Sequence, residues 1–402
     1  MRQLFRTIFA TFLLLPLLFS ISSCSHEKNG EQGTDMTVLV YMAADNNLSS
    51  GNFHQQDIDE MVRAAGDVPS DCRLLVYVDD KNYPRILSIE KHNGKAAALV
   101  QHEYDVEHDS GKPETLAEVM RWVTTHSPSE RYGLVLWSHG ESWVPAKAPA
   151  QRVICVDSST GSWMEIDDLA NVLSQFQRLE YILFDACFMQ SVEVAYELRY
   201  AARYIIASPA EIPNPGAPYD YLVSALFAFP TSPHLIAAEY CLYYEENVVP
   251  VNEHYYPGEY YGALLSIVDC NHMDALAAAT AQVIEKYVTP SIPCNLKNLL
   301  CYYPILKSSR PQYFDMDAYM RRLITDMEDY HQWKQVFNSA VPRRCGTDWW
   351  FSNDAGELPV DKSVYGGISC YVPQNTTARS KLNTKFRATE WYAAAGWQAV
   401  GW

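Results

Sequence analysis

Two apolar stretches decide the fold of this chain: Tyr132-Gly-Leu-Val-Leu-Trp-Ser-His-Gly140 and Tyr181-Ile-Leu-Phe-Asp-Ala-Cys187. Each stretch is typical of a buried strand, and each ends in a reactive side chain, His139 in the first and Cys187 in the second. In open α/β sheets, ligands and reacting groups gather just beyond the carboxyl ends of the strands. If the two strands are parallel neighbours, the sequence predicts an imidazole and a thiol at one edge of the sheet. That pair is the minimum for a cysteine nucleophile assisted by a histidine base.

The rest of the chain predicts a sheet with helices on both faces. Strand and helix patterns alternate from about residue 36 to residue 208, which favours a mostly parallel α/β sheet. Beyond Pro230 helical patterns dominate, and they surround one convincing strand, Tyr261–Val268. We therefore expect a sheet domain over residues 36–230 and a helix-rich C-terminal region over residues 231–402 that packs on it. The expected helices of that region are His234–Glu246, Met273–Tyr287 and Met316–Gln335.

Composition narrows the class of protein. The 402 residues are 48% hydrophobic and 20% charged, which is typical of a globular chain. A net charge of −17 disfavours nucleic acid as a partner, because phosphate contacts need a basic surface. The 10 cysteines include no CxxC pair, so zinc-ribbon and thioredoxin motifs are not supported. Most of these cysteines are expected to be buried thiols, and disulfides between some of them stay open.

The N-terminus predicts export and lipid attachment. Arg2 and Arg6 accompany an apolar stretch from Leu4 to Ile21, which ends in small residues before Cys24. This pattern resembles a bacterial lipoprotein signal over residues 1–23, with Cys24 as the lipidated first residue and residues 24–35 as a linker. An ordinary cleavage site and a transmembrane anchor are the alternatives. We expect a protein held at the cell envelope by its N-terminal lipid.

Local sequence around the two reactive side chains supports chemistry at this edge. A helix is predicted from near Gln190, and the positive end of its dipole would stabilise a Cys187 thiolate, as would an imidazolium at His139. Gly140 allows close approach of a substrate, and its N–H and that of Cys187 would form an oxyanion hole. The alternative is an inert core cysteine and a structural histidine.

Several segments of the chain resemble those of a known family. Tyr132–Gly140 with its Ser-His-Gly ending and Phe184-Asp-Ala-Cys187 are similar to the signature segments of clostripain-like cysteine peptidases, which belong to the caspase-like clan. Val38–Leu48 and Ala207–Pro213 resemble two further segments of that family. The resemblance covers about residues 36–225 and is only loose in the C-terminal part. It implies a caspase-like, mostly parallel sheet flanked by helices.

The resemblance also implies roles for individual residues. His139 matches the catalytic histidine, Cys187 the nucleophile, and Asp185 the acid that selects arginine or lysine at P1. A buried carboxylate without a partner is costly, so a substrate cation would complete such a pocket. The alternative for Asp185 is a capping or strand-end hydrogen bond. The loop after the fifth strand departs from the family pattern, and Glu211 within it would either be a second acid of the pocket or lie in solvent.

Two further expectations concern activation and metals. Members of the family are commonly matured by cleavage between the histidine and cysteine strands, and Lys147 and Arg152 suit self-cleavage in the loop after His139. A loop that stays intact is the alternative. No cofactor is expected, except that Asp45, Asp79 and Asp80 would suit Ca²⁺ with their oxygen ligands. They form no EF-hand loop, and ordinary strand-end acids are the simpler interpretation.

The sequence thus predicts a monomeric, lipid-anchored cysteine endopeptidase that cleaves peptide or protein substrates after Arg or Lys. A catalytically inactive lipoprotein of the same fold, binding protein or glycan, is the alternative. Its 27 tyrosines and 10 tryptophans would suit such stacking, although most aromatic residues are core residues. A transferase or ligase using the same thiol is a third interpretation.

Overall fold

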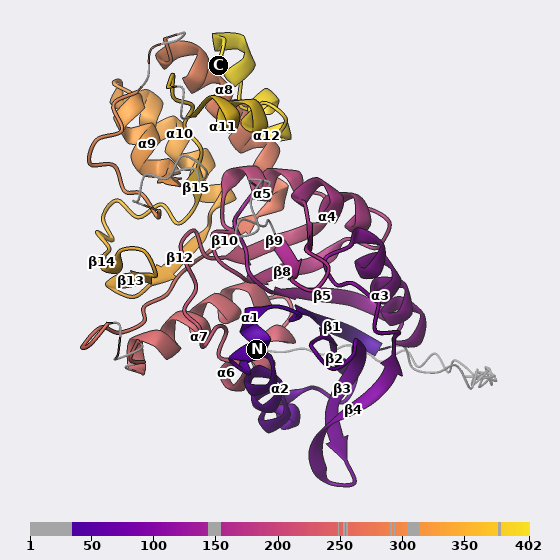
Figure 1. Ribbon diagram of the computed structural model, residues 1–402. Helices are drawn as coiled ribbons and strands as arrows, with labels where there is room; N and C mark the ends of the chain where they lie inside the picture. Colours follow the sequence, from indigo (N-terminus) through magenta and orange to yellow (C-terminus); the bar gives the residue numbers. More distant parts are fainter. Residues whose placement is uncertain are drawn as a thin grey trace, which may run out of the picture. The chain divides into compact units, whose positions relative to one another are not determined.

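Nine strands build one central sheet in the order β12-β10-β9-β8-β5-β1-β2-β3-β4 (Figure 1). The computed structural model describes residues 34–143, 154–247, 249–251, 254, 256–289, 292, 294–303, 313–376 and 379–402. The five central strands, from β9 to β2, run parallel to one another, and each strand outside them pairs with its neighbour in antiparallel register. The bounds of the nine strands are β1 Thr34–Ala43, β2 Cys72–Asp79, β3 Arg85–His92, β4 Lys95–Glu103, β5 Ser129–Trp137, β8 Leu179–Asp185, β9 Ala202–Ala207, β10 Leu264–Asp269 and β12 Arg343–Gly346.

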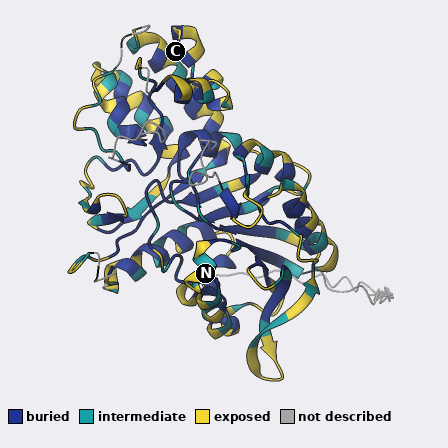
Figure 2. Cartoon of the chain, viewed as in Figure 1, coloured by how far each residue is buried: buried dark blue, intermediate teal, exposed yellow. Residues whose placement is uncertain are grey.

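Helices cover both faces of the sheet, because its strands carry apolar side chains on both sides. Leu39 and Tyr41 of β1 point into one hydrophobic core, whereas Val38 and Val40 point into the other. The first core packs against α3 Pro113–His126, α4 Ile166–Leu173, α5 Val192–Glu197 and α8 Met273–Tyr287. The second packs against α2 Phe53–Arg63, α6 Tyr219–Leu226 and α7 Ser232–Glu246. Figure 2 shows the middle strands of the sheet as mostly buried and the end of the β3–β4 hairpin as exposed.

The remaining elements are short. Three two-stranded sheets pair β6 Ile154–Asp157 with β7 Ser162–Met164, β11 Phe314–Asp315 with β15 Ser369–Cys370, and β13 Trp349–Ser352 with β14 Gly356–Pro359. The other α-helices are α1 Asn47–Ser50, α9 Met316–Leu323, α10 Met327–Ala340, α11 Ser380–Phe386 and α12 Glu390–Ala394, and η1 Ala65–Asp67, η2 Cys270–His272 and η4 Trp397–Val400 are single 3₁₀ turns.

The predicted α/β fold class, a mostly parallel sheet flanked by helices, is confirmed. Two strands of this sheet, β10 and β12, come from beyond residue 230, so the C-terminal region supplies part of the sheet as well as helices. One predicted helix, Met316–Gln335, is wrong as a single element. The chain forms α9 and α10 instead, because Ile324 is extended and the Asp326 side chain caps a new helix by accepting from Glu328 N.

One disulfide joins two elements from beyond residue 230. Cys241 of α7 and Cys345 of β12 are bonded, with their Cα atoms 6.2 Å apart. No second disulfide joins the cysteines in the described part of the chain, whose remaining members are Cys72, Cys155, Cys187, Cys270, Cys294, Cys301 and Cys370. No helix within the described residues is long and apolar enough to span a bilayer.

Candidate active site

The strands that precede His139 and Cys187 are parallel neighbours, as the sequence predicted. In the β5–β8 pairing Trp137 lies opposite Asp185. His139 and Cys187 each follow two residues after this pair, so both leave the sheet at the same edge. Both residues are partly exposed, in contrast to the buried strand residues that precede them, Tyr132–Trp137 in β5 and Tyr181–Asp185 in β8.

Gly140 brings the two strand ends into direct contact. A Cβ atom added at Gly140 would lie 2.7 Å from the carbonyl oxygen of Cys187 and 2.9 Å from Cβ of Ala186. Those separations are too short for any side chain, so glycine is required by the close approach of the two backbones. The histidine loop and the cysteine loop therefore lie against each other.

His139 is held by a residue that the sequence analysis did not single out. Its Nε2 lies 2.7 Å from Oδ1 of Asn47, the first residue of α1, which follows β1. β1 is the neighbour of β5 in the sheet, so a side chain just past the end of β1 can reach one just past the end of β5. Asn47 belongs to the same segment, Val38–Leu48, on which the family resemblance was partly based.

Cys187 lies in a turn and not at a helix N-terminus. Phe188, the next residue, has a φ of 60°, and α5 begins only at Val192, capped by Ser191. The predicted stabilisation of a thiolate by this helix is therefore wrong: the thiol is five residues from the first helical residue, beyond the first turn where the dipole acts. Instead the backbone N–H of Ile212, in the loop after β9, points to Sγ of Cys187 at 3.3 Å.

The C-terminal region forms part of the surroundings of Cys187. The thiol residue packs against an aromatic cluster that includes Phe188, Tyr303 and Tyr313. Phe188 stacks on Tyr313 with ring centroids 5.2 Å apart. The hydroxyl of Tyr313 also donates to the carbonyl oxygen of Glu141 at 2.8 Å. Residues far along the chain thus support both the cysteine turn and the histidine loop.

Asp185 lies below the cysteine turn and is almost fully buried, with 5% of its surface exposed. Its carboxylate accepts the N–H of Ala217 at 3.2 Å and the hydroxyl of Tyr219 at 3.2 Å. Burial raises the pKa of Asp185 to about 6, although these two donors act in the opposite direction. Among the described residues, the groups that donate hydrogen bonds to this carboxylate are therefore all neutral.

Two more acids near Asp185 were missed by sequence reasoning, Asp57 and Glu60, one turn apart on α2. Asp57 is 3% exposed and accepts the indole N–H of Trp137 at 2.6 Å. Glu60 accepts the backbone N–H of Tyr219 at 2.9 Å. A signal was present in the sequence, because Asp57 lies beside Ile58 and one turn before Met61 on the apolar face of the helix. A carboxylate on a core-facing stripe is unusual and indicates a special environment.

Glu211 is buried, so the interpretation that it lies in solvent is wrong. It is 8% exposed, and its carboxylate accepts the backbone N–H of Asn353 at 3.0 Å. Asn353 lies in the turn between β13 and β14. Glu211 therefore ties the loop after β9 to the β13–β14 hairpin.

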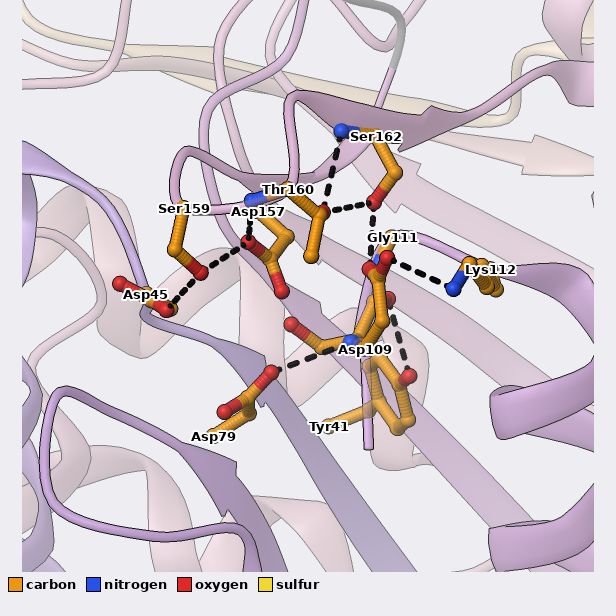
Figure 3. Close-up of polar contacts among 11 residues, drawn as sticks. Tyr41, Asp45, Asp79, Asp109, Gly111, Lys112, Asp157, Ser159, Thr160 and Ser162 are labelled. Atoms are coloured by element: carbon orange, nitrogen blue, oxygen red, sulfur yellow. Dashed lines mark hydrogen bonds and ion pairs between the residues drawn. The ribbon is translucent and has the colours of Figure 1, made fainter. Parts of the chain in front are cut away.

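The three acids proposed for Ca²⁺ do not gather in one place. Asp80 forms ion pairs with His54 and Arg85. Figure 3 shows Asp45 and Asp79 in a separate network of acids and hydroxyl groups, in which Ser159 joins Asp45 to Asp157 and Ser110 N donates to Asp79. Within the described residues no group of three or more His, Cys, Asp or Glu side chains is placed to hold a metal ion. Calcium binding stays a prediction.

Three predicted residues cannot be placed. Cys24, the predicted lipidation site, and Lys147 and Arg152, the predicted processing sites, lie outside the described residues.

Comparison with known proteins identifies the family. A sequence profile described as the Clostripain family matches residues 40–402, which is nearly the whole described chain. The chain belongs to the clostripain family. This match extends to residue 402, whereas the motifs of the sequence resemble the family only over about residues 36–225. Membership confirms the predicted family and its class, the cysteine peptidases.

Individual clostripain-family relatives agree with this assignment. Clostripain of Hathewaya histolytica is 25% identical over 246 residues, which cover 52% of this chain and 46% of that protein. The match thus spans less than half of that relative's length. A secreted C11 cysteine protease from Bacteroides thetaiotaomicron, solved with an irreversible peptide inhibitor, superposes with a TM-score of 0.79 and 32% identity over 91% of this chain and 99% of its own. An inactive zymogen C11 protease from Parabacteroides distasonis gives a TM-score of 0.76 and 29% identity over 91% and 99%.

Proposed function

We propose that this clostripain-family protein is a cysteine endopeptidase that hydrolyses peptide bonds after arginine or lysine, with His139 and Cys187 as its catalytic pair. One observation carries the proposal. The register of β5 and β8 brings both residues to the same edge of the sheet, and Gly140 is in backbone contact with Cys187. A nucleophile and a base at one sheet edge are the arrangement that acyl transfer needs.

The reaction follows from these groups. His139 takes the proton of the Cys187 thiol and becomes an imidazolium, while Sγ forms a bond to the carbonyl carbon of the substrate. The carbonyl oxygen becomes an oxyanion held by the N–H groups of Gly140 and Cys187. The C–N bond then breaks, and the imidazolium of His139 gives its proton to the leaving amine. Water, deprotonated by His139, attacks the carbonyl carbon of the remaining thioester. The C–S bond then breaks, the acid is released, and His139 returns the proton to the Cys187 thiolate.

Asn47 acts in this proposal as a positioning residue. When Nε2–H of His139 donates to Asn47 Oδ1, the imidazole is fixed in one tautomer, and Nδ1 is the nitrogen that exchanges protons.

Asp185 selects the basic P1 side chain. It is a buried carboxylate with neutral donors, so a substrate guanidinium or ammonium group would supply the missing positive charge. Activation by cleavage at Lys147 or Arg152 remains part of the proposal, supported by the basic residues in that loop.

We also propose that the protein is exported and held as a monomer at the cell envelope by a lipid on Cys24. The signal-like sequence of residues 1–23 supports this location. So does the disulfide between Cys241 and Cys345, because such bonds persist in oxidising compartments. The Bacteroides thetaiotaomicron relative is described as secreted.

The direct test measures hydrolysis of fluorogenic peptides with Arg or Lys at P1. We expect Cys187→Ala and His139→Ala each to lower kcat/KM by about 10³-fold or more, because each removes one partner of the reacting pair. Cys294→Ala, which removes a partly exposed free thiol elsewhere, is the matched control and should retain full activity. Undiminished turnover in either active-site variant would refute the assignment.

The wild type and the His139→Ala variant also distinguish an enzyme from the alternative, a catalytically inactive protein that binds protein or glycan. An electrophilic peptide probe should label wild-type Cys187 and should fail to label the His139→Ala variant. Equal, slow labelling of both would indicate a thiol without an assisting base and would favour the binding protein.

A further inference from the structure

Asp57 and Asp185 come from different elements but lie on the same side of the sheet. Trp137 and Asp185 are register partners at the ends of β5 and β8, so their side chains point to the same face. Trp137 donates its indole N–H to Oδ2 of Asp57 at 2.6 Å. The indole therefore places the Asp57 carboxyl group over the face that Asp185 occupies.

Tyr219 links Asp185 to α2, the helix that carries Asp57. Tyr219 of α6 donates its hydroxyl to Asp185 and its backbone N–H to Glu60, which is one turn after Asp57 on α2. Asp57 and Asp185 also repel each other. Burial, and then the charge of Asp185, raises the pKa of Asp57. Burial, and then the negative charges of Asp185, Asp57 and Glu60, raise the pKa of the Tyr219 hydroxyl, so the three acids lie near this side chain at the start of α6.

The hydrogen bonds to Asp57 and Asp185 in the described part of the chain come from neutral groups. Within the described residues, the donors to Asp57 and Asp185 are one indole N–H, one backbone N–H and one phenolic hydroxyl, all of them neutral. Arg63, the basic residue at the end of α2, forms its short ion pair with Asp220, at 2.9 Å, and lies 3.8 Å from Glu60. Two almost fully buried carboxyl groups therefore have no cationic partner among the described residues, and one of them directly precedes the cysteine turn.

We propose that Asp57 belongs to the P1 pocket, and that Asp57 and Asp185 together bind the guanidinium group of a P1 arginine. The inference rests on the proposed function, because it takes Asp185 to face the P1 side chain. A guanidinium group presents five N–H donors in a rigid plane and can satisfy carboxylates on two sides. The two acids lie on α2 and at the end of β8, so they approach such a group from different elements.

A structural role for Asp57 makes a different prediction. In that case the acid would serve to orient Trp137 and would share a proton with Asp185, and its charge would not affect the choice of substrate. Asp57→Asn separates the two roles, because the amide oxygen can still accept the indole N–H while the negative charge is lost.

The experiment compares matched peptides with arginine or citrulline, its neutral isostere, at P1. For Asp57→Asn we expect kcat/KM for the arginine peptide to fall about 10- to 100-fold, as is typical when one partner of a buried charge pair is removed. The citrulline peptide should change less than threefold. The control is Asp59→Asn, which removes the same charge from an exposed position on the same helix and should leave both values unchanged. An unchanged preference for arginine over citrulline in folded Asp57→Asn, or an equal loss for both peptides, would overturn the proposal.

A binding measurement keeps this test independent of turnover. Calorimetric titration of Cys187→Ala with a peptide that ends in a C-terminal arginine should give a Kd at least tenfold tighter than that of Cys187→Ala/Asp57→Asn. If the wild type hydrolyses no peptide and this difference remains, the peptidase proposal fails while the role of Asp57 stands. If the two Kd values are equal, the role of Asp57 fails. Should Asp57→Asn lower the melting temperature by more than a few degrees, Asp57→Ser serves in both measurements.

Discussion

At the scale of single residues, the geometry of His139 depends on Asn47. The 2.7 Å contact between Nε2 and the amide oxygen joins the end of β5 to the start of α1. Asn47 lies outside the loop of His139, and its contact fixes the orientation of the imidazole ring. An imidazole that turns away loses its alignment with the thiol even though both residues remain present.

We therefore expect Asn47→Leu to lower kcat by about 10- to 100-fold with little change in KM, because misplacing a reacting group affects the chemical step more than substrate binding. Asn47→Asp retains an acceptor and should restore much of the activity. The acid limb of the kcat/KM profile should move to higher pH in Asn47→Asp, because a carboxylate favours the imidazolium, and to lower pH in Asn47→Leu.

The control for this prediction is Ser50→Ala, on the same short helix, which should behave as the wild type. A change in KM alone, or pH profiles that coincide for all the variants, would show that Asn47 does not act through His139.

The sequence predicted the site residues that follow the ends of strands, His139 and Cys187. It did not predict Asn47 and Asp57, which contact the site from other parts of the chain. His139 and Cys187 are visible because each ends an apolar run, and the parallel pairing of β5 and β8 then follows from strand–helix alternation. Asn47 and Asp57 reach the site through contacts between segments that lie about 80 to 90 residues apart in the chain. No local periodicity encodes which distant partner such a side chain meets.

At the scale of elements, the disulfide between α7 and β12 attaches a helix of one face to the last strand of the sheet. Its two cysteines are 104 residues apart in the chain. The spacing of ten cysteines could not predict this pair, because many pairings are compatible with one sequence. Similarly, the sequence from Met316 to Gln335 has a continuous helical pattern, which conceals the break between α9 and α10. Asp326 caps the start of α10 at this break.

We expect loss of this disulfide to destabilise the protein by about 2–4 kcal/mol, because the cross-link restricts the unfolded chain over a long loop. Cys241→Ser, Cys345→Ser and the double variant should all melt several degrees below the wild type. Differential scanning calorimetry with and without dithiothreitol measures this change. The reductant should lower the melting temperature of the wild type and leave that of the double variant unchanged, and an insensitive wild type would contradict the prediction.

At the scale of the whole molecule, the active edge and the C-terminal region are parts of one structure. β10 pairs with β9 in antiparallel register, Ser266 opposite Ala207, and β12 pairs with β10 in turn. Helix α7 adds Ile236, Tyr240 and Tyr244 to the core that also contains Trp137. Sequence patterns beyond residue 230 predicted helices and one strand, Tyr261–Val268, where β10 lies. They could not show that β10 and β12 join the sheet of the first part of the chain, because such pairing depends on contacts between distant segments.

We therefore expect a fragment of residues 34–230 to fail to fold on its own. Cutting there would leave the backbone groups of β9 unpaired at a new sheet edge and expose the apolar face that α7 covers. The fragment would also lose Tyr313, which supports Glu141 and packs on Phe188. Circular dichroism melting and hydrogen exchange of the fragment, beside residues 34–402, provide the test. The longer protein should unfold cooperatively, and the fragment should aggregate or exchange its amides without protection. A cooperative transition in the fragment, together with labelling of Cys187 by a peptide electrophile at the rate of the longer protein, would show instead that residues 34–230 form an autonomous catalytic domain.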